Sequence, residues 1–219
     1  MIGTLEEVRP MPQVSLSELV TGARSGQALV SFPTDTVPAL AARPDQSGLI
    51  YQAKQRSQDK PLILMGSTLD ELLPYVVGTA EEIALWRQVA DQHWPGALTL
   101  VLPTSSQAPP EMNPQQTGTL GIRVPDHPLA RYILAQTGPL ATTSANRSGQ
   151  PPLQTLGEIA EQFPEVLILS PEALQALENE VGDMLDDPNE QPSGSGLPST
   201  VARWAGQGWE ILRQGAVQL

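Results

Sequence analysis

The sequence contains no cysteine and only two histidines, His93 and His127. Disulfide bonds, thiolate catalysis and cysteine-based metal sites are therefore excluded, and so is a metal site built from several histidines. No run of 18 apolar residues occurs, so we expect no membrane-spanning helix. Residues 1–12 lack the basic start and the apolar stretch of a secretory signal. These features predict a soluble cytoplasmic protein.

Lysine is also rare, and the acidic residues are unevenly distributed. The chain has two lysines, Lys54 and Lys60, which flank Arg56 within one short segment. This clustering indicates a cationic site. The net charge is −12, but residues 148–202 hold ten acidic residues and no lysine or arginine, whereas the rest of the chain holds 14 acids against 12 bases. A nearly balanced body with one acidic region need not repel nucleic acid.

The remaining sequence is patterned as alternating helices and strands, and 40% of its 219 residues are hydrophobic, which is enough for a core. Capping-box patterns predict helices that begin after Ser15, Thr68, Thr79 and Thr155. Apolar spacing predicts further helices at residues 49–55 and 128–136, and strands at 28–32, 62–65, 98–102, 120–124, 140–143, 166–169, 200–204 and 209–212. The last two strands form a hairpin that turns at 206–208. We expect one α/β domain with a mixed sheet and flanking helices, and a flexible loop at residues 186–199.

Three short polar side chains, Thr34, Asp35 and Thr36, follow the first predicted strand. In open α/β sheets such side chains bind ligands beyond the strand ends. An ordinary Asx-type turn has the same composition. Taken alone, the pattern favours the ordinary turn.

Cationic residues stand next to other predicted elements. Lys54 and Arg56 close a predicted helix, and Lys60 follows four residues later. They fit a phosphate or carboxylate site, or they simply complement the helix dipole at its C-terminus. Arg123 lies in an otherwise apolar strand, so it must either pair with a carboxylate of the fold or reach a cleft.

Residues 142–149 form the densest cluster of hydroxyl and amide side chains in the chain, directly after a predicted strand. Such a segment can enclose an adenine, a ribose or a phosphate, or it can be a plain Ser/Thr-rich turn. Ser199 precedes a late strand and Arg213 ends the final hairpin. Because these groups all lie at predicted strand ends, the sequence predicts a cleft for a small anionic ligand.

Seven motifs occur in the order found in the YrdC-like family, which the sequence therefore resembles. They are PTDTV at residues 33–37, KxR at 54–56 with KPL at 60–62, WPGxLT at 94–99, RVPxHP at 123–128, SANxSG at 144–149, STV at 199–201 and LRxG at 212–215. The resemblance implies a single domain over residues 10–217, with a twisted mixed sheet and a deep concave cleft lined by positive charge.

The resemblance also implies an activity, that of a threonylcarbamoyl-AMP synthase. This enzyme converts L-threonine, bicarbonate and ATP to threonylcarbamoyl-adenylate and diphosphate, for the threonylcarbamoyladenosine modification of tRNA. By analogy, Thr36, Arg123 and Ser199 would bind threonine. ATP would be bound by Arg56, Lys60, Thr119, Thr142, Ser144, Asn146 and Arg213. Lys54 and Arg56 would be the catalytic cations, both facing solvent-filled space. Magnesium would be carried by ATP, with no metal site in the protein itself.

Three departures from the family pattern leave a second interpretation open. Pro38 and Ala39 replace a Tyr-Gly pair, Met65 stands where many synthases have histidine, and residues 171–198 form a longer acidic stretch in place of a glycine-rich turn. The alternative is a paralogue that binds nucleotide or double-stranded RNA without completing the reaction. With only 12 basic residues and 4% aromatics, at most a weak RNA contact is expected. A synthase would instead deliver its product to downstream tRNA-modifying transferase proteins.

Overall fold

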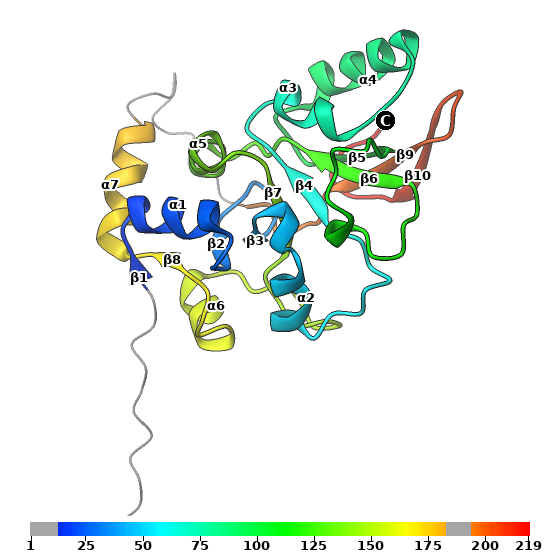
Figure 1. Cartoon of the computed structure of the whole chain (residues 1–219). Coiled ribbons are helices and arrows are strands. Elements are labelled where there is room, and N and C mark those ends of the chain that lie inside the picture. The colour runs from blue at the N-terminus through cyan, green and yellow to red at the C-terminus, as the bar shows by residue number, and fades with distance from the viewer. Residues whose placement is uncertain (1–12, 183–193) are drawn as a thin grey trace, which may run out of the picture.

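The computed structural model describes residues 13–182 and 194–219 (Figure 1). Its helices are α1 (Leu16–Ser25), α2 (Gly48–Lys54), α3 (Leu69–Leu72), α4 (Ala80–His93), α5 (Pro128–Thr137), α6 (Leu156–Gln162) and α7 (Pro171–Gly182). Its strands are β1 (Gln13–Val14), β2 (Val30–Phe32), β3 (Ala39–Ala42), β4 (Ile63–Met65), β5 (Leu98–Pro103), β6 (Thr119–Arg123), β7 (Leu140–Ser144), β8 (Ile168–Leu169), β9 (Thr200–Trp204) and β10 (Trp209–Arg213). The predicted α/β class is confirmed. Residues 10–12 of the predicted domain and 186–193 of the predicted loop lie outside the described residues.

Local capping explains where the helices begin. The boxes that start at Ser15, Thr79 and Thr155 form completely, with the side chain of each cap and that of the glutamate three residues later both bonded to backbone amides. The fourth forms only in part. Thr68 accepts a hydrogen bond from the amide of Glu71, but the Glu71 carboxylate accepts from the amide and hydroxyl of Ser67 instead of returning to Thr68. The predicted start of α3 is nevertheless correct.

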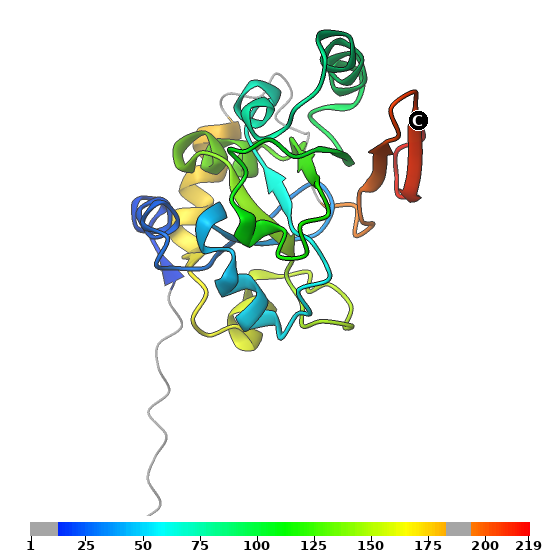
Figure 2. The same ribbon diagram turned by 45° about the vertical axis from the view of Figure 1, so that its right-hand side comes forward.

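The main sheet has eight strands in the order β10-β9-β5-β6-β4-β7-β3-β2. The pairs β4–β6 and β5–β9 are parallel and the others are antiparallel, so the predicted twisted, mixed sheet is confirmed (Figure 1). The predicted final hairpin is β9–β10, which stands at one edge of the molecule (Figure 2). The opposite edge strand, β2, is continued by a bridge between Val30 and Leu167, next to the small parallel β1–β8 sheet.

Besides the two-residue strand β1, two elements were not predicted from the sequence. β3 is an alanine-rich segment, buried between β2 and β7, and alanine is a poor indicator of strands. Residues 33–38 are therefore the loop of a β2–β3 hairpin, not a connection leaving the carboxyl edge of the sheet. α7 occupies the first part of the acidic stretch and buries Leu177 and Val181. Neither segment has a sequence pattern that strongly predicts its secondary structure.

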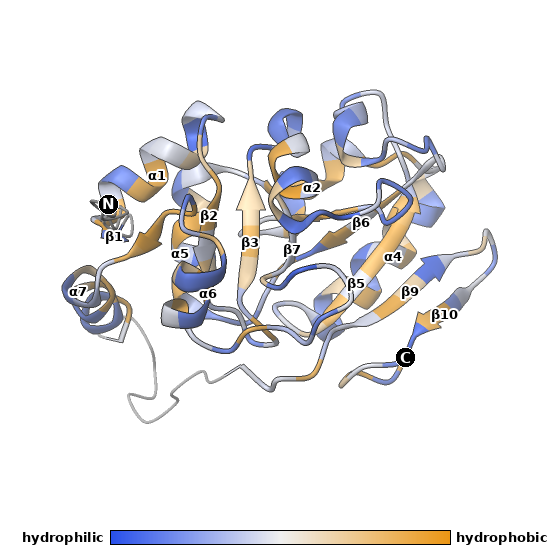
Figure 3. Cartoon of the chain, turned by 90° about the horizontal axis from the view of Figure 1, so that it is seen from below, coloured by the Kyte–Doolittle hydropathy of each residue, from blue (hydrophilic) through white to orange (hydrophobic). Residues whose placement is uncertain are grey.

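The central strands have two different faces, and this alternation positions the site. On β5, Leu98, Leu100 and Leu102 are buried in the main hydrophobic core, and the strand is coloured hydrophobic along most of its length (Figure 3). Thr99 and Val101 point to the opposite face. The helices α1, α5 and α7 pack together over a second core at the β2 side. Among the described residues, no helix is long and apolar enough to cross a bilayer.

Candidate active site

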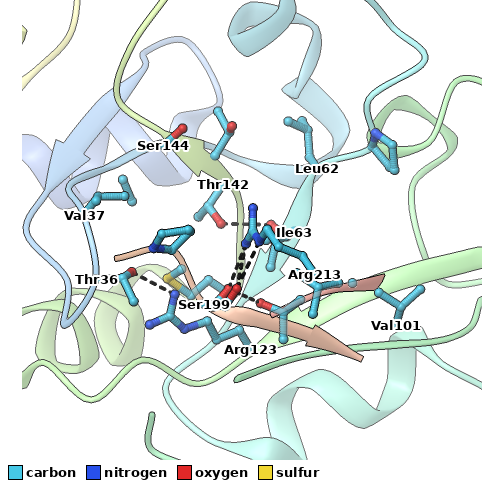
Figure 4. Close-up of a pocket in the computed structure, with 18 of the residues that line it drawn as sticks. Thr36, Val37, Leu62, Ile63, Val101, Arg123, Thr142, Ser144, Ser199 and Arg213 are labelled. Carbon is cyan, nitrogen blue, oxygen red and sulfur yellow. Dashed lines mark hydrogen bonds between the residues drawn. The ribbon is translucent and has the colours of Figure 1, made fainter. Parts of the chain in front are cut away.

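A pocket of about 650 Å³ lies on the sheet face opposite the main core (Figure 4). Its floor is formed by alternate residues of β4, β5, β6, β7 and β9, and its walls by the β2–β3 loop, the segment after β7 and the segment before β9. The sequence predicted a cleft at the strand ends. The structure corrects this location, since most of the lining residues lie on the face of the strands. A volume of this size is typical of small-molecule sites.

The pocket collects nine of the eleven predicted site residues. They are Thr36, Arg56, Thr119, Arg123, Thr142, Ser144, Asn146, Ser199 and Arg213. These residues come from separate parts of the chain, and the sheet topology brings them together. The two exceptions are Lys54 and Lys60, which do not line it.

Lys54 does not face solvent-filled space, contrary to the prediction. Its side chain is only 1% exposed, because α2 ends immediately afterwards at Gln55 and its last turn packs under the segment that follows β7. The Lys54 ammonium donates to the carbonyl of Ser144 and to Oδ1 of Asn146, 3.3 Å away. Burial and, secondarily, the charge of Arg56 lower the pKa of Lys54 to about 7. Lys54 therefore supports the pocket wall from behind.

Arg56 lines the pocket, and Lys60 helps to hold it there through its backbone. The guanidinium of Arg56 donates to the carbonyl of Lys60 over 3.2 Å and to that of Pro61 over 3.3 Å, while the Lys60 side chain is exposed. Burial lowers the pKa of Arg56. Arg56 forms no ion pair with any described residue. Its charge is therefore available to a ligand.

Arg123 both pairs with a carboxylate and reaches the pocket, so the two alternatives raised by the sequence are both correct. Its Nη1 donates to the Thr36 hydroxyl over 3.0 Å (Figure 4). Its Nη2 lies 2.6 Å from Asp35, and its Nε donates to the carbonyl of Gly96 over 3.0 Å. Burial lowers the pKa of Arg123, and the charge of Asp35 opposes that effect. Asp35 also compensates the charge that Arg123 brings into the pocket.

The loop that carries Thr36 is a hydrogen-bonded turn and also part of the site. Thr34 accepts a bond from the amide of Thr36 over 3.2 Å and donates to the carbonyl of Val37 over 2.7 Å. Residues 194–196 cross this loop, where Ser195 and Gly196 donate to the carbonyls of Asp35 and Thr36 over 2.9 Å. The loop is therefore fixed from both sides.

Arg213 is a second pocket arginine without an acidic partner among the described residues. It donates to the Ser199 carbonyl over 2.9 and 3.1 Å and to the Ser199 hydroxyl over 3.3 Å (Figure 4). That hydroxyl also shares a 2.9 Å hydrogen bond with Thr99. Partial burial and, secondarily, the charge of Arg123 lower the pKa of Arg213. Neither Arg56 nor Arg213 thus forms an ion pair with a described residue.

The segment after β7 is ordered by its own side chains. Ser144 donates to Oδ1 of Asn146 over 2.5 Å, and the Asn146 amide donates to the carbonyls of Arg147 and Gln150 over 2.9 and 2.6 Å. Thr142 donates to the carbonyl of Ile63 on β4 over 3.0 Å. These groups form a preorganised wall.

Several polar lining residues were not assigned from the sequence. They are Thr34, Thr99, Thr117, Thr143, Gln150 and Arg203. Thr34 and Thr99 lie inside motifs noted above, so the sequence held a signal for them. For Arg203 and Gln150 the sequence held no such signal, because only strand register and loop geometry bring these two residues to the pocket. No cluster of potential metal ligands is found in residues 13–182 and 194–219.

Comparison with known proteins agrees with this geometry. The family model Sua5/YciO/YrdC, described as "Telomere recombination", matches residues 23–215. The threonylcarbamoyl-AMP synthase of Chromohalobacter salexigens is 35% identical over 163 residues, which cover 73% of this chain and 85% of that protein. The threonylcarbamoyl-AMP synthase of Bacillus subtilis is 34% identical over 196 residues, which cover 86% of this chain and 50% of that protein.

Solved structures show the same relationship. P. abyssi Sua5, crystallised with L-threonine, superposes with a TM-score of 0.72 at 28% identity, covering 91% of this chain and 54% of that one. E. coli YciO superposes with a TM-score of 0.70 at 21% identity, covering 93% of this chain and 90% of that one, which indicates a shared fold. This chain thus spans about half the length of the longer relatives. The match over residues 23–215 shows that the chain belongs to the Sua5/YciO/YrdC family.

Proposed function

We propose that this chain is a threonylcarbamoyl-AMP synthase, which forms threonylcarbamoyl-adenylate and diphosphate from L-threonine, bicarbonate and ATP for tRNA modification. The observation that carries the proposal is that one pocket combines Arg56 and Arg213, which form no ion pair with a described residue, with the buried Arg123. The names of the relatives and the threonine bound to P. abyssi Sua5 support it. The product would pass to tRNA-modifying transferase proteins in the cytoplasm.

The amino acid would bind beside Thr36, Arg123 and Ser199. Of the five N–H donors of Arg123, three are used by Gly96, Thr36 and Asp35. The two that remain can bind a carboxylate in the geometry that arginine favours. The hydroxyl of Ser199 is oriented by Arg213 and Thr99 toward the same region.

The nucleotide would lie against Arg56, Arg213 and the wall after β7. When an oxygen of the carboxylated threonine attacks the α-phosphorus, the bond to diphosphate breaks and negative charge grows on the leaving group. Arginines fixed by backbone carbonyls stabilise that charge without reorganising. Thr119, Thr142, Ser144 and Asn146 would position the nucleotide. Lys54 would act through Ser144 and Asn146, and Lys60 through its carbonyl, without touching the phosphates.

Magnesium would arrive with the triphosphate. Among the described residues that line the pocket there is no aspartate or glutamate. The described part of the lining therefore offers no carboxylate ligand, and a hard cation of this kind is commonly held by phosphate oxygens and water.

The proposal is tested by incubating the protein with labelled ATP. Diphosphate release that requires both threonine and bicarbonate is the expected result. Arg56→Ala should lower kcat/KM for ATP on the order of 100-fold, since it removes one charge-stabilising group, whereas Arg131→Ala, on an exposed face of α5, should not. ATP binding without threonine-dependent release would contradict the proposal and point to the nucleotide-binding paralogue.

A further inference from the structure

One pocket arginine is left without a role by the proposed reaction. Arg203 lies on β9, two residues after Val201 and four after Ser199, and all three line the pocket. Alternate residues of a strand share a face, so the three side chains form a line from the amino-acid end toward the rim. The intervening residue Ala202 is buried in the core on the other side.

Strand register places Arg203 at the end of a row that crosses the pocket floor. Arg203 is paired with Val101 on β5, Val101 with Gly121 on β6, and Gly121 with Ile63 on β4. The neighbouring row contains Arg123 on β6 and its partner Met65 on β4. The two rows lie about 7 Å apart, which is two residues along a strand.

A ligand whose carboxylate binds at Arg123 would therefore extend over the row that Arg203 ends. Arg56 donates to the carbonyl of Pro61, two residues before Ile63, and so it stands near the β4 end of this row. Arg203 stands at the β9 end. The two arginines flank the outer part of the pocket from opposite sides.

Arg203 is already neutralised, but by a partner that is easily exchanged. Its Nη2 and Nε lie 2.5 and 3.1 Å from one carboxylate oxygen of Glu210 on β10. The two side chains are 46% and 50% exposed. Ion pairs this exposed contribute little to the stability of a protein, because solvent screens them. A phosphate group in the pocket, with more charge and a better fit to the guanidinium, would compete effectively with Glu210.

The charges in the pocket favour such an exchange. Even with a magnesium ion on the triphosphate, ATP and a threonine carboxylate bring more negative charge than Arg56 and Arg213 can balance, and Arg123 is compensated by Asp35. We propose that Arg203 is a third phosphate-binding residue, which exchanges its ion pair with Glu210 for contact with the diphosphate portion of the nucleotide. This proposal rests on the proposed function for the identity of the nucleotide.

The test compares two variants that break the same ion pair. Arg203→Gln should weaken the binding of ATP and of inorganic diphosphate on the order of tenfold, since it removes a charged hydrogen-bond donor. Glu210→Gln should strengthen both a few-fold, since it frees the arginine. AMP, which lacks the diphosphate, should bind equally to both variants and to the unchanged protein. Titration calorimetry measures all three ligands.

A second exposed pair provides the control. Arg87 and Asp70 lie 2.8 Å apart, Arg87 is 46% exposed like Arg203, and neither residue lines the pocket. Arg87→Gln should leave all three affinities unchanged. Unfolding midpoints of the variants show that the hairpin remains folded.

The proposal is overturned if Arg203→Gln and Glu210→Gln shift ATP affinity in the same direction, because the pair would then only stabilise the hairpin. It is equally overturned if neither variant shifts the affinity, or if AMP responds as ATP does. Binding and turnover are separate readouts. Opposite shifts in diphosphate affinity without any turnover would support the Arg203 site and contradict the synthase assignment. Turnover without opposite shifts would support the synthase assignment and contradict the Arg203 site.

Discussion

At the scale of single residues, two buried cationic side chains of this protein have different surroundings. Arg123 has a carboxylate beside it, whereas Lys54 is surrounded by neutral oxygens of Ser144 and Asn146. Burial of a charge is costly unless the charge is paired or the group loses it. Arg123 stays charged through Asp35. Lys54 instead has its pKa lowered to about 7, so it can become neutral near physiological pH.

The pKa of Lys54 makes stability depend on pH. In the unfolded chain a lysine titrates near 10.4, so between about pH 7 and pH 10 the unfolded state binds more protons at this position than the folded state. The contribution of Lys54 to stability therefore rises with pH in that window, and below pH 7 the cost of burying the charge is fully present. Relative to Lys54→Met, the free energy of unfolding should gain about 3 kcal/mol from pH 6.5 to 9.5.

Urea denaturation at several pH values measures this difference, because titrations common to both proteins cancel. Lys60→Met, in which an exposed lysine is replaced, serves as the control and should show no pH-dependent difference. A Lys54→Met difference that stays constant with pH would contradict the account.

The partner of Arg123 should be important for stability. Asp35→Ala would leave the guanidinium buried without compensation, which costs about 3 kcal/mol of unfolding free energy. Asp45→Ala breaks an exposed pair with Arg43 and should cost much less, because solvent screens that pair. Chemical denaturation of the two variants decides the point. Equal losses would show that burial of the Asp35–Arg123 pair has no energetic weight.

At the scale of elements, the site depends on contacts between loops that are distant in sequence. Residues 194–196 fix the β2–β3 loop through two backbone hydrogen bonds. Gly194 lies so close to that loop that a Cβ would be 2.7 and 2.8 Å from the carbonyl oxygens of Thr36 and Thr34. These oxygens belong to backbone and cannot swing away. Glycine at this position is thus a requirement of the loop contact.

Gly194→Ala should therefore displace the loop that presents Thr36. We expect the KM for threonine to rise several-fold while the KM for ATP changes little, since the nucleotide wall lies after β7. Gly48→Ala is a matched control, because nothing lies within 4 Å of its added Cβ. Steady-state kinetics with each substrate varied in turn provides the measurement. Equal increases for both substrates would indicate a general loss of structure.

At the scale of the whole molecule, the predictability of each feature follows its physical origin. Residues near one another in sequence, such as the cap at Thr79 or the hairpin at 206–208, were predicted because local hydrogen bonding determines them. The site residues inside the motifs were predicted because seven short motifs follow one another in the order found in the YrdC-like family. The burial of Lys54 was not predicted, because it depends on how the end of α2 packs against a segment 90 residues later in the chain. β3 and Arg203 needed the register of the sheet.

The β9–β10 hairpin also gives the protein an internal optical probe. Trp204 packs edge-on against both Trp86, at 6.2 Å, and Trp209, at 5.2 Å, and its indole N–H donates to Glu82. Trp204 follows Arg203 in the chain, and Trp209 precedes Glu210. Both indoles lie on the strand face opposite Arg203 and Glu210, so a change in that ion pair reaches them only if the hairpin itself moves. Tryptophan fluorescence would then report movement of this hairpin when a ligand binds, without an attached dye.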